Sequence, residues 1–137
     1  MIGILIVTHS NLGEALINAA EFILNGKPEA TEALSINLNQ DVDKLRNKVK
    51  EGIKRVKSNE GVLIMTDMFG GTPSNLSYSF LEEGRIEVIS GANLPMLVKA
   101  VNARDKMNLS ELAVTLEAYG KKSISLASSI LKGNKRG

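Results

Sequence analysis

Short apolar runs alternate with helical segments along this chain, and that alternation constrains the fold more than any other feature. The apolar runs lie at residues 2–8, 33–38, 62–66 and 86–90. They are rich in aliphatic and β-branched residues, as strands buried in a sheet are. A segment with apolar residues at three- and four-residue spacing follows each run and predicts a helix. The pattern therefore predicts an α/β fold, a mostly parallel open sheet flanked by helices on both faces.

Capping residues indicate where the predicted helices begin. Asp41 is expected to cap the second helix. Thr72 is expected to cap the third, with Pro73 as its first residue, because the missing N–H of proline costs nothing there. The last helix is expected from Ser110, with Gly120 as a candidate interruption.

Composition limits the domain organisation and the function classes. No linker or shift of composition divides the chain, so we expect one domain over residues 1–133 and a basic tail over residues 134–137. The 17 basic and 15 acidic residues give a net charge of +2, which is too small for an electrostatic nucleic-acid binder. Aromatic residues make up 4% of the chain and tryptophan is absent, so platforms for base stacking are not expected.

The missing cysteines exclude disulfide and thiolate chemistry and are consistent with a cytoplasmic protein. With a single histidine, only carboxylates remain as further metal ligands, and we predict neither a metal nor a cofactor. The first apolar run is about seven residues long and lacks a basic leader, which indicates neither a signal peptide nor a membrane span.

The single histidine, His9, follows the first apolar run, where a strand is expected to end beside the start of a helix. Ligands of open α/β sheets bind at that edge, and the loops after the first, third and fourth runs share it. Asp67, in the loop after the third run, can therefore reach His9. A carboxylate that accepts the N–H of one ring nitrogen leaves the other as a nucleophile. Either residue alone is more often structural, but their joint placement favours a reactive pair.

The residues around this pair indicate what the imidazole attacks. Gly70 and Gly71 allow the backbone to approach a ligand closely, and the helix after them offers N–H groups to an anion. The hydroxyls of Ser10, Thr66 and Thr72 add candidate donors. These groups suit a phosphoryl group, which carries a charge of about −1.5 to −2. The three loops contain no lysine or arginine, so transfer of the phosphoryl group is favoured over its retention.

Three apolar residues near the same loops are candidates for a docking surface. Met68, Phe69 and Met96 are predicted to form an apolar lip for protein partners, with core packing as the alternative.

Three segments carry a resemblance to a known family. Residues 3–10 read GILIVTHS, residues 67–75 read DMFGGTPSN, and residues 91–97 read GANLPML. The first resembles the family's opening strand with its histidine and small polar residue. The second resembles an Asp-x-x-Gly-Gly-Ser/Thr-Pro-x-Asn loop, and the third a Gly-x-Asn-x-Pro-Met-Leu segment. Together and in this order they resemble the IIA component of the mannose-type (mannose–fructose–sorbose) sugar phosphotransferase systems of bacteria.

The resemblance implies an enzyme that transfers phosphoryl groups between proteins. His9 would accept the group from phospho-HPr, a histidine phosphocarrier, and pass it to a histidine of a IIB component, which phosphorylates the sugar during uptake. The phosphate would sit on the ring nitrogen farther from the backbone, while Asp67 orients the nearer one. Residues 1–133 would form the IIA domain, often a homodimer in which an edge strand is exchanged. Family members are often fused to a IIB domain; this chain ends after one domain, so we expect a separate IIB partner and only indirect contact with a membrane.

In two alternatives His9 is still phosphorylated, but the phosphorylated protein serves a different function. One is the phosphoryl-transfer subunit of a dihydroxyacetone kinase system, against which the double glycine and the segment NLPML at residues 93–97 argue. The other is a stand-alone regulatory protein that takes no part in sugar transport.

Overall fold

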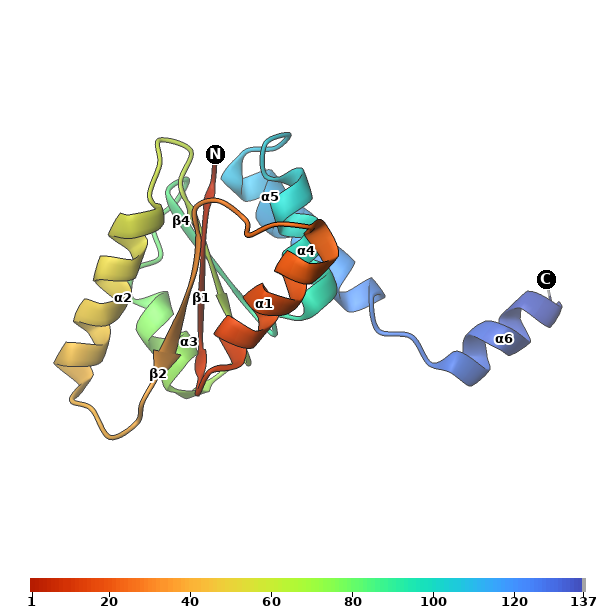
Figure 1. Ribbon diagram of the computed structural model, residues 1–137, viewed down its shortest axis with the longest axis horizontal. Coiled ribbons are helices and arrows are strands. Elements are labelled where there is room, and N and C mark those ends of the chain that lie inside the picture. The colour runs from red at the N-terminus through yellow and green to blue at the C-terminus, as the bar shows by residue number, and fades with distance from the viewer. Residues whose placement is uncertain (137) are drawn as a thin grey trace.

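The computed structural model describes residues 1–136, with side chains described for residues 1–132. This part of the chain holds four strands and six helices and confirms the predicted α/β alternation (Figure 1). In chain order they are β1 (Gly3–His9), α1 (Leu12–Leu24), β2 (Thr31–Ile36), α2 (Val42–Val56), β3 (Val62–Thr66), α3 (Gly71–Tyr78), β4 (Ile86–Ser90), α4 (Leu94–Ala103), α5 (Leu109–Lys122) and α6 (Ala127–Arg136). The basic tail expected over residues 134–137 lies outside the described side chains and stays a prediction.

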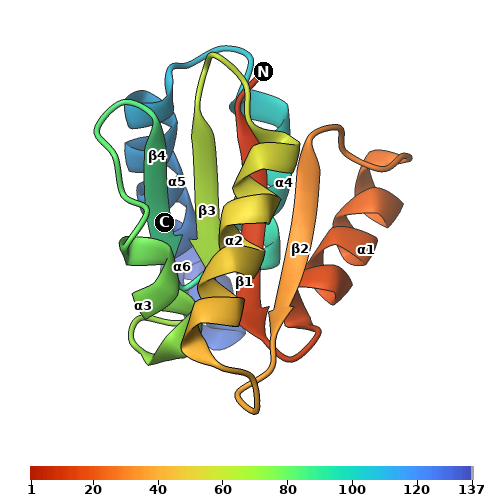
Figure 2. The same ribbon diagram turned by 90° about the vertical axis from the view of Figure 1, so that its left-hand side faces the viewer.

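The four described strands form one parallel sheet in the order β2-β1-β3-β4 (Figure 2). The chain leaves β1 for β2 on one side and then crosses to β3 on the other side of β1. The boundary between β1 and β3 is therefore the topological switch point, where open α/β sheets bind their ligands. Val7 of β1 pairs with Thr66 of β3. This register brings the residues that follow, His9 and Asp67, to the same edge of the sheet.

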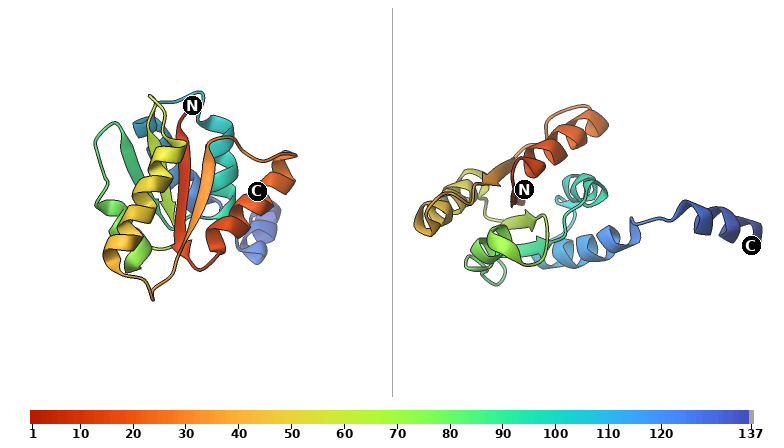
Figure 3. Two further views of the ribbon diagram at one scale, coloured as in Figure 1. Left: turned by 60° about the vertical axis from the view of Figure 1, so that its left-hand side comes forward. Right: turned by 90° about the horizontal axis from the view of Figure 1, so that it is seen from below.

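Helices cover both faces of the sheet, as predicted. α2 and α3 pack on one face, where Leu5 and Val7 of β1 point, and α1, α4 and α5 pack on the other, where Ile4 and Ile6 point. Successive residues of β1 thus enter two different cores, which explains why the first strand is apolar throughout. α6 stands apart from both layers, beyond residues 123–126 (Figure 3).

Two boundaries differ from the predictions because local side-chain and backbone effects decide them. The second strand is predicted at residues 33–38 but lies at residues 31–36, since the side-chain oxygen of Asn37 accepts the N–H of Asn39 and turns the chain. Asp41 does cap α2, accepting from the N–H of Asp43. Thr72 does not cap α3: the helix begins at Gly71 with Gly70 as its N-cap and without a side-chain hydrogen bond.

The last predicted helix is divided, but not at Gly120. α5 begins one residue earlier than expected, because Asn108 and Glu111 form a reciprocal capping box. Gly120 lies inside α5, where a Cβ atom would come within 2.6 Å of the Met96 Cε. This glycine therefore permits close packing of α5 against α4 rather than a break. The chain leaves the helix after Lys122.

Candidate functional site

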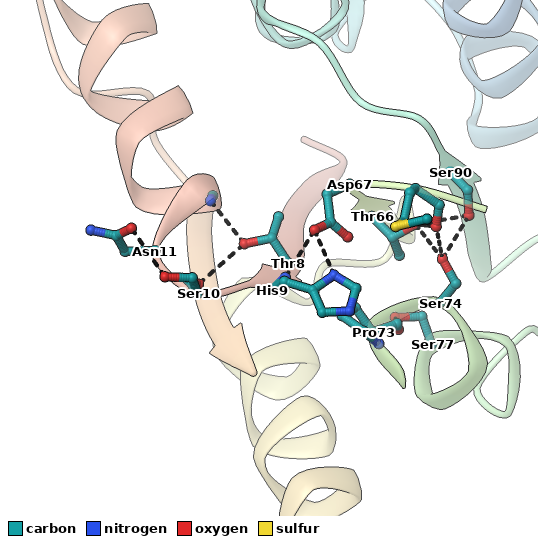
Figure 4. A network of polar contacts seen from close by, with 12 residues as sticks. Thr8, His9, Ser10, Asn11, Thr66, Asp67, Pro73, Ser74, Ser77 and Ser90 are labelled. Atoms are coloured by element: carbon teal, nitrogen blue, oxygen red, sulfur yellow. Dashed lines mark hydrogen bonds and ion pairs between the residues drawn. The ribbon is translucent and has the colours of Figure 1, made fainter. Parts of the chain in front are cut away.

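His9 is the last residue of β1, and a single carboxylate oxygen holds both its backbone and its ring. The His9 backbone N–H donates to Asp67 Oδ2 at 2.9 Å, and His9 Nδ1 lies 2.9 Å from the same oxygen (Figure 4). An ionised carboxylate can only accept, so Nδ1 carries the proton and the lone pair of the neutral ring is on Nε2. The predicted contact between ring and acid is present. The second hydrogen bond, to the backbone, has no signal in the sequence.

The environment of Asp67 keeps the carboxylate ionised. Its side chain is only 10% exposed, against 36% for His9. Burial raises the pKa of the Asp67 carboxyl, but the hydrogen bonds from the His9 backbone and ring and the charge of the imidazolium outweigh it, so the pKa lies below its ordinary value. Oδ1 is buried and has no hydrogen-bond partner among the described residues, so the polar contacts of this carboxylate are directed at His9.

The other side of the imidazole faces Gly71, the second residue of a glycine pair. A Cβ atom at Gly71 would lie 3.1 Å from His9 Cε1 and 3.4 Å from Nε2, whereas a Cβ at Gly70 would meet nothing within 4 Å. Both glycines have positive φ, +85° and +82°, in the left-handed region that favours glycine. The turn thereby brings the start of α3 and its free N–H groups close to Nε2. A helix start of this kind suits an anion held on that nitrogen.

The three hydroxyl residues predicted around the phosphate lie in different places. Thr72 is half-buried in the first turn of α3, next to Gly71. Ser10 is exposed, and its hydroxyl contacts Asn11 Oδ1 on the side away from the imidazole. Thr66 is fully buried, and its hydroxyl contacts Ser74 and Ser90. Because protein groups already surround that hydroxyl, we assign Thr66 to the support of the loop rather than to the phosphate.

The three predicted docking residues differ in exposure. Met68 and Phe69 are exposed, Phe69 at 82%, but Met96 is wrong as a surface residue because only 4% of it is exposed. It is the third residue of α4 and faces the core. Sequence reasoning missed three further exposed apolar residues: Leu12 and Val42, which begin α1 and α2, and Leu38, in the turn after β2. These residues, together with Met68 and Phe69, all follow the carboxyl ends of β1, β2 and β3, the edge of the sheet that carries His9, and we call the five of them the apolar rim.

The described residues contain neither a helix suited to cross a membrane nor a cluster of metal ligands. No helix in this part of the chain has the length and apolar character needed to cross a membrane. The same residues contain no group of three or more histidine or acidic side chains placed to hold a metal ion.

Comparison with known proteins gives concordant matches. A sequence model of the family described as "PTS system fructose IIA component" matches residues 3–117. The fructose-specific EIIA component of the phosphotransferase system of Bacillus subtilis is 29% identical over 133 residues, which are 96% of this chain and 90% of that protein. The mannose-specific EIIAB component of Escherichia coli is 33% identical over 105 residues, which are 76% of this chain but only 32% of that longer protein. The crystal structure of phosphotransferase system component EIIA from Streptococcus agalactiae has a TM-score of 0.84 at 26% identity, covering 94% of this chain and 99% of that one.

Proposed function

The chain belongs to the mannose-type family of phosphotransferase-system IIA components, and from this premise we propose that His9 Nε2 carries a phosphoryl group between two proteins. The donor is phospho-HPr, and the acceptor is a histidine of a separate IIB component that serves sugar uptake. The exchange takes place in the cytoplasm, and the chain meets the membrane only through the transporter that IIB serves. The observation that carries the proposal is the placement of His9 between the Asp67 carboxylate and the glycine turn.

The geometry supports each part of the transfer. The Nε2 lone pair attacks phosphorus, the P–N bond of the donor breaks, and its electron pair returns to the donor imidazole. The His9 ring becomes positively charged, and the Asp67 carboxylate on Nδ1 stabilises that charge. Backbone N–H groups at Gly71 and Thr72 are the candidate donors to the phosphoryl oxygens. The second transfer repeats these steps with His9 as the donor.

The open edge of the sheet fits two successive protein partners. The His9 side chain is 36% exposed, so a second histidine can approach in line. Around it the apolar rim offers surface for brief docking of a partner, with Met68 and Phe69 in the loop that also carries Asp67. We infer that both partners use this rim in turn.

Labelling with phosphoenolpyruvate, the first enzyme of the phosphotransferase system and HPr tests the function. We expect label that is acid-labile and base-stable, with a phosphorus NMR signal of an Nε2-phosphohistidine. Addition of a IIB component should discharge it. Labelling without discharge to any IIB component would favour the regulatory alternative, and an absence of labelling would contradict the proposal.

Gly71→Ala is expected to slow phosphorylation by phospho-HPr by about 100-fold, because a Cβ would occupy the space beside Nε2. Gly70→Ala is the matched control: it has the same backbone strain, but its Cβ would point into open space. The initial rate of labelling measures both variants. Equal rates in the two variants would show that strain, and not the approach of the turn to the ring, is what matters.

We propose that the chain forms a homodimer through the free edge of β4. Val88 and Ser90 of this strand line a groove of about 500 Å³, together with Phe69 and residues of α5. Beyond α5, residues 123–126 lead to α6 (Figure 1). Ile130 of this helix is exposed. An exposed strand edge and an exposed apolar helix are both surfaces that a second copy would cover.

Light scattering is expected to give twice the 14.8 kDa mass of one chain. Ile130→Glu should shift the mass toward that of the monomer, because a charge cannot be buried unpaired at an apolar contact. Phe22→Glu on α1, also an exposed apolar residue, is the control and should leave the dimer intact. A wild-type monomer at high concentration would contradict this arrangement.

A further inference from the structure

Four hydroxyl groups form a cluster directly behind the loop that carries Asp67. Thr66 Oγ1 lies 2.7 Å from Ser74 Oγ and 2.7 Å from Ser90 Oγ. Ser90 Oγ lies 3.1 Å from Ser74 Oγ and 2.8 Å from the hydroxyl of Tyr78. Thr66 and Ser74 are fully buried. The cluster joins the ends of β3 and β4 to α3 (Figure 4).

The cluster fixes the backbone on both sides of Asp67. Thr66 precedes Asp67, and the Ser74 hydroxyl donates to the carbonyl of Met68, which follows it. Thr66 Oγ1 is also near that carbonyl, but at 3.4 Å it is a weaker donor. Ser74 is thus the principal side-chain donor that ties the Asp67 loop to α3.

The same helix carries the turn on the other side of the ring. Gly71 begins α3 and lies against the Nε2 side of His9, while Asp67 bonds to Nδ1. A shift of the loop relative to α3 would therefore change the distance between the carboxylate and the N–H groups that flank the imidazole. The bond from Ser74 to the Met68 carbonyl connects the loop to this helix.

We propose that Ser74 is a positioning residue for phosphoryl transfer: its bond to the Met68 carbonyl holds the Asp67 carboxylate and the start of α3 at the spacing that the imidazole requires. Ser74 touches neither His9 nor Asp67 by a hydrogen bond. It acts through the loop. This inference rests on the proposed function only for the predicted rates of phosphoryl transfer. The tautomer and hydrogen bond of the His9 ring can be measured without any partner protein.

Ser77 provides a matched control within the same helix. It is also a fully buried serine of α3, and its hydroxyl also donates to a backbone carbonyl, that of Pro73, at 2.7 Å. Among the described residues, its hydroxyl makes no hydrogen bond to the hydroxyl cluster. Ser74→Ala and Ser77→Ala both remove the hydroxyl of a buried serine that donates to a backbone carbonyl, but only Ser74→Ala removes a contact of the Asp67 loop.

The experiment compares these variants by nitrogen NMR of the His9 imidazole and by transfer kinetics. In wild type and in Ser77→Ala we expect the Nδ1-protonated ring with a strong hydrogen bond, and in Ser74→Ala a mixture of tautomers. The kcat of transfer from phospho-HPr should fall about 10-fold in Ser74→Ala with little change in KM, and less than about 2-fold in Ser77→Ala. If Ser74→Ala does not fold, Ser90→Ala, which removes another member of the cluster, should show the same tautomer mixture.

Equal effects of the two serine variants, or an unchanged ring in Ser74→Ala and Ser90→Ala, would overturn the proposal. A wild-type protein that is not phosphorylated would instead overturn the proposed function. The NMR comparison would then still decide whether Ser74 sets the pose of His9.

Discussion

His9→Ala is expected to abolish phosphorylation of the chain by phospho-HPr. The variant lacks the nucleophile, and His9 is the only histidine in the sequence, so no second imidazole can replace it. The fold should survive, because the alanine keeps the backbone N–H that donates to Asp67. Loss of the ring removes one hydrogen bond to a charged group, which costs about 1.5–3 kcal/mol.

Incorporation of label from phosphoenolpyruvate, with the first enzyme and HPr present, measures this directly. Ser10→Ala is the control, since Ser10 is the next residue but its hydroxyl contacts Asn11 and not the imidazole. We expect near-normal labelling of that variant. Label retained in His9→Ala would place the phosphoryl group elsewhere and would remove the basis of the proposed function.

The pairing of His9 with Asp67 could be predicted because it depends only on where strands end. In a parallel sheet the carboxyl ends share one edge, and two apolar runs that stop before a histidine and an aspartate bring those residues together. The glycine turn was predictable for a similar reason, since consecutive glycines before a helix indicate backbone close to a ligand. Both features can be read from the order of the residues along the chain.

The direction of individual side chains could not be predicted in this way. Thr66 ends β3, and its hydroxyl points into the hydroxyl cluster, a contact that depends on Ser90 of a neighbouring strand. Met96 faces the core because Asn93 caps α4 and sets the rotation of the helix. The role of Ser74 depends on the relative position of a loop and a helix, which no periodicity reports. Side chains that join separate elements are therefore where sequence reasoning fails.

Asp67→Asn is expected to slow phosphoryl transfer by about 100-fold or more while the domain remains folded. The neutral amide does not fix the tautomer that carries its proton on His9 Nδ1, and it does not balance the positive charge of the phosphorylated ring. The nitrogen NMR spectrum of His9 should show both tautomers in this variant. Single-turnover transfer from phospho-HPr measures the rate. Asp43→Asn, at an exposed carboxylate on α2, is the control and should leave the rate unchanged.

Acid titration of stability gives a second test of the same carboxylate. Folding lowers the pKa of the Asp67 carboxyl below the ordinary value of an aspartate, so the folded state favours the ionised form. Its contribution to the free energy of unfolding is therefore complete above the pH at which the unfolded carboxyl titrates, and it is lost as the pH falls through the lower, folded pKa. Wild type should be more stable than Asp67→Asn at neutral pH, and the difference should shrink in acid. If the free energy of unfolding of the two proteins changed in parallel with pH down to about pH 2, folding would not stabilise the charge of Asp67. The imidazole would then lack the charged partner that the transfer requires.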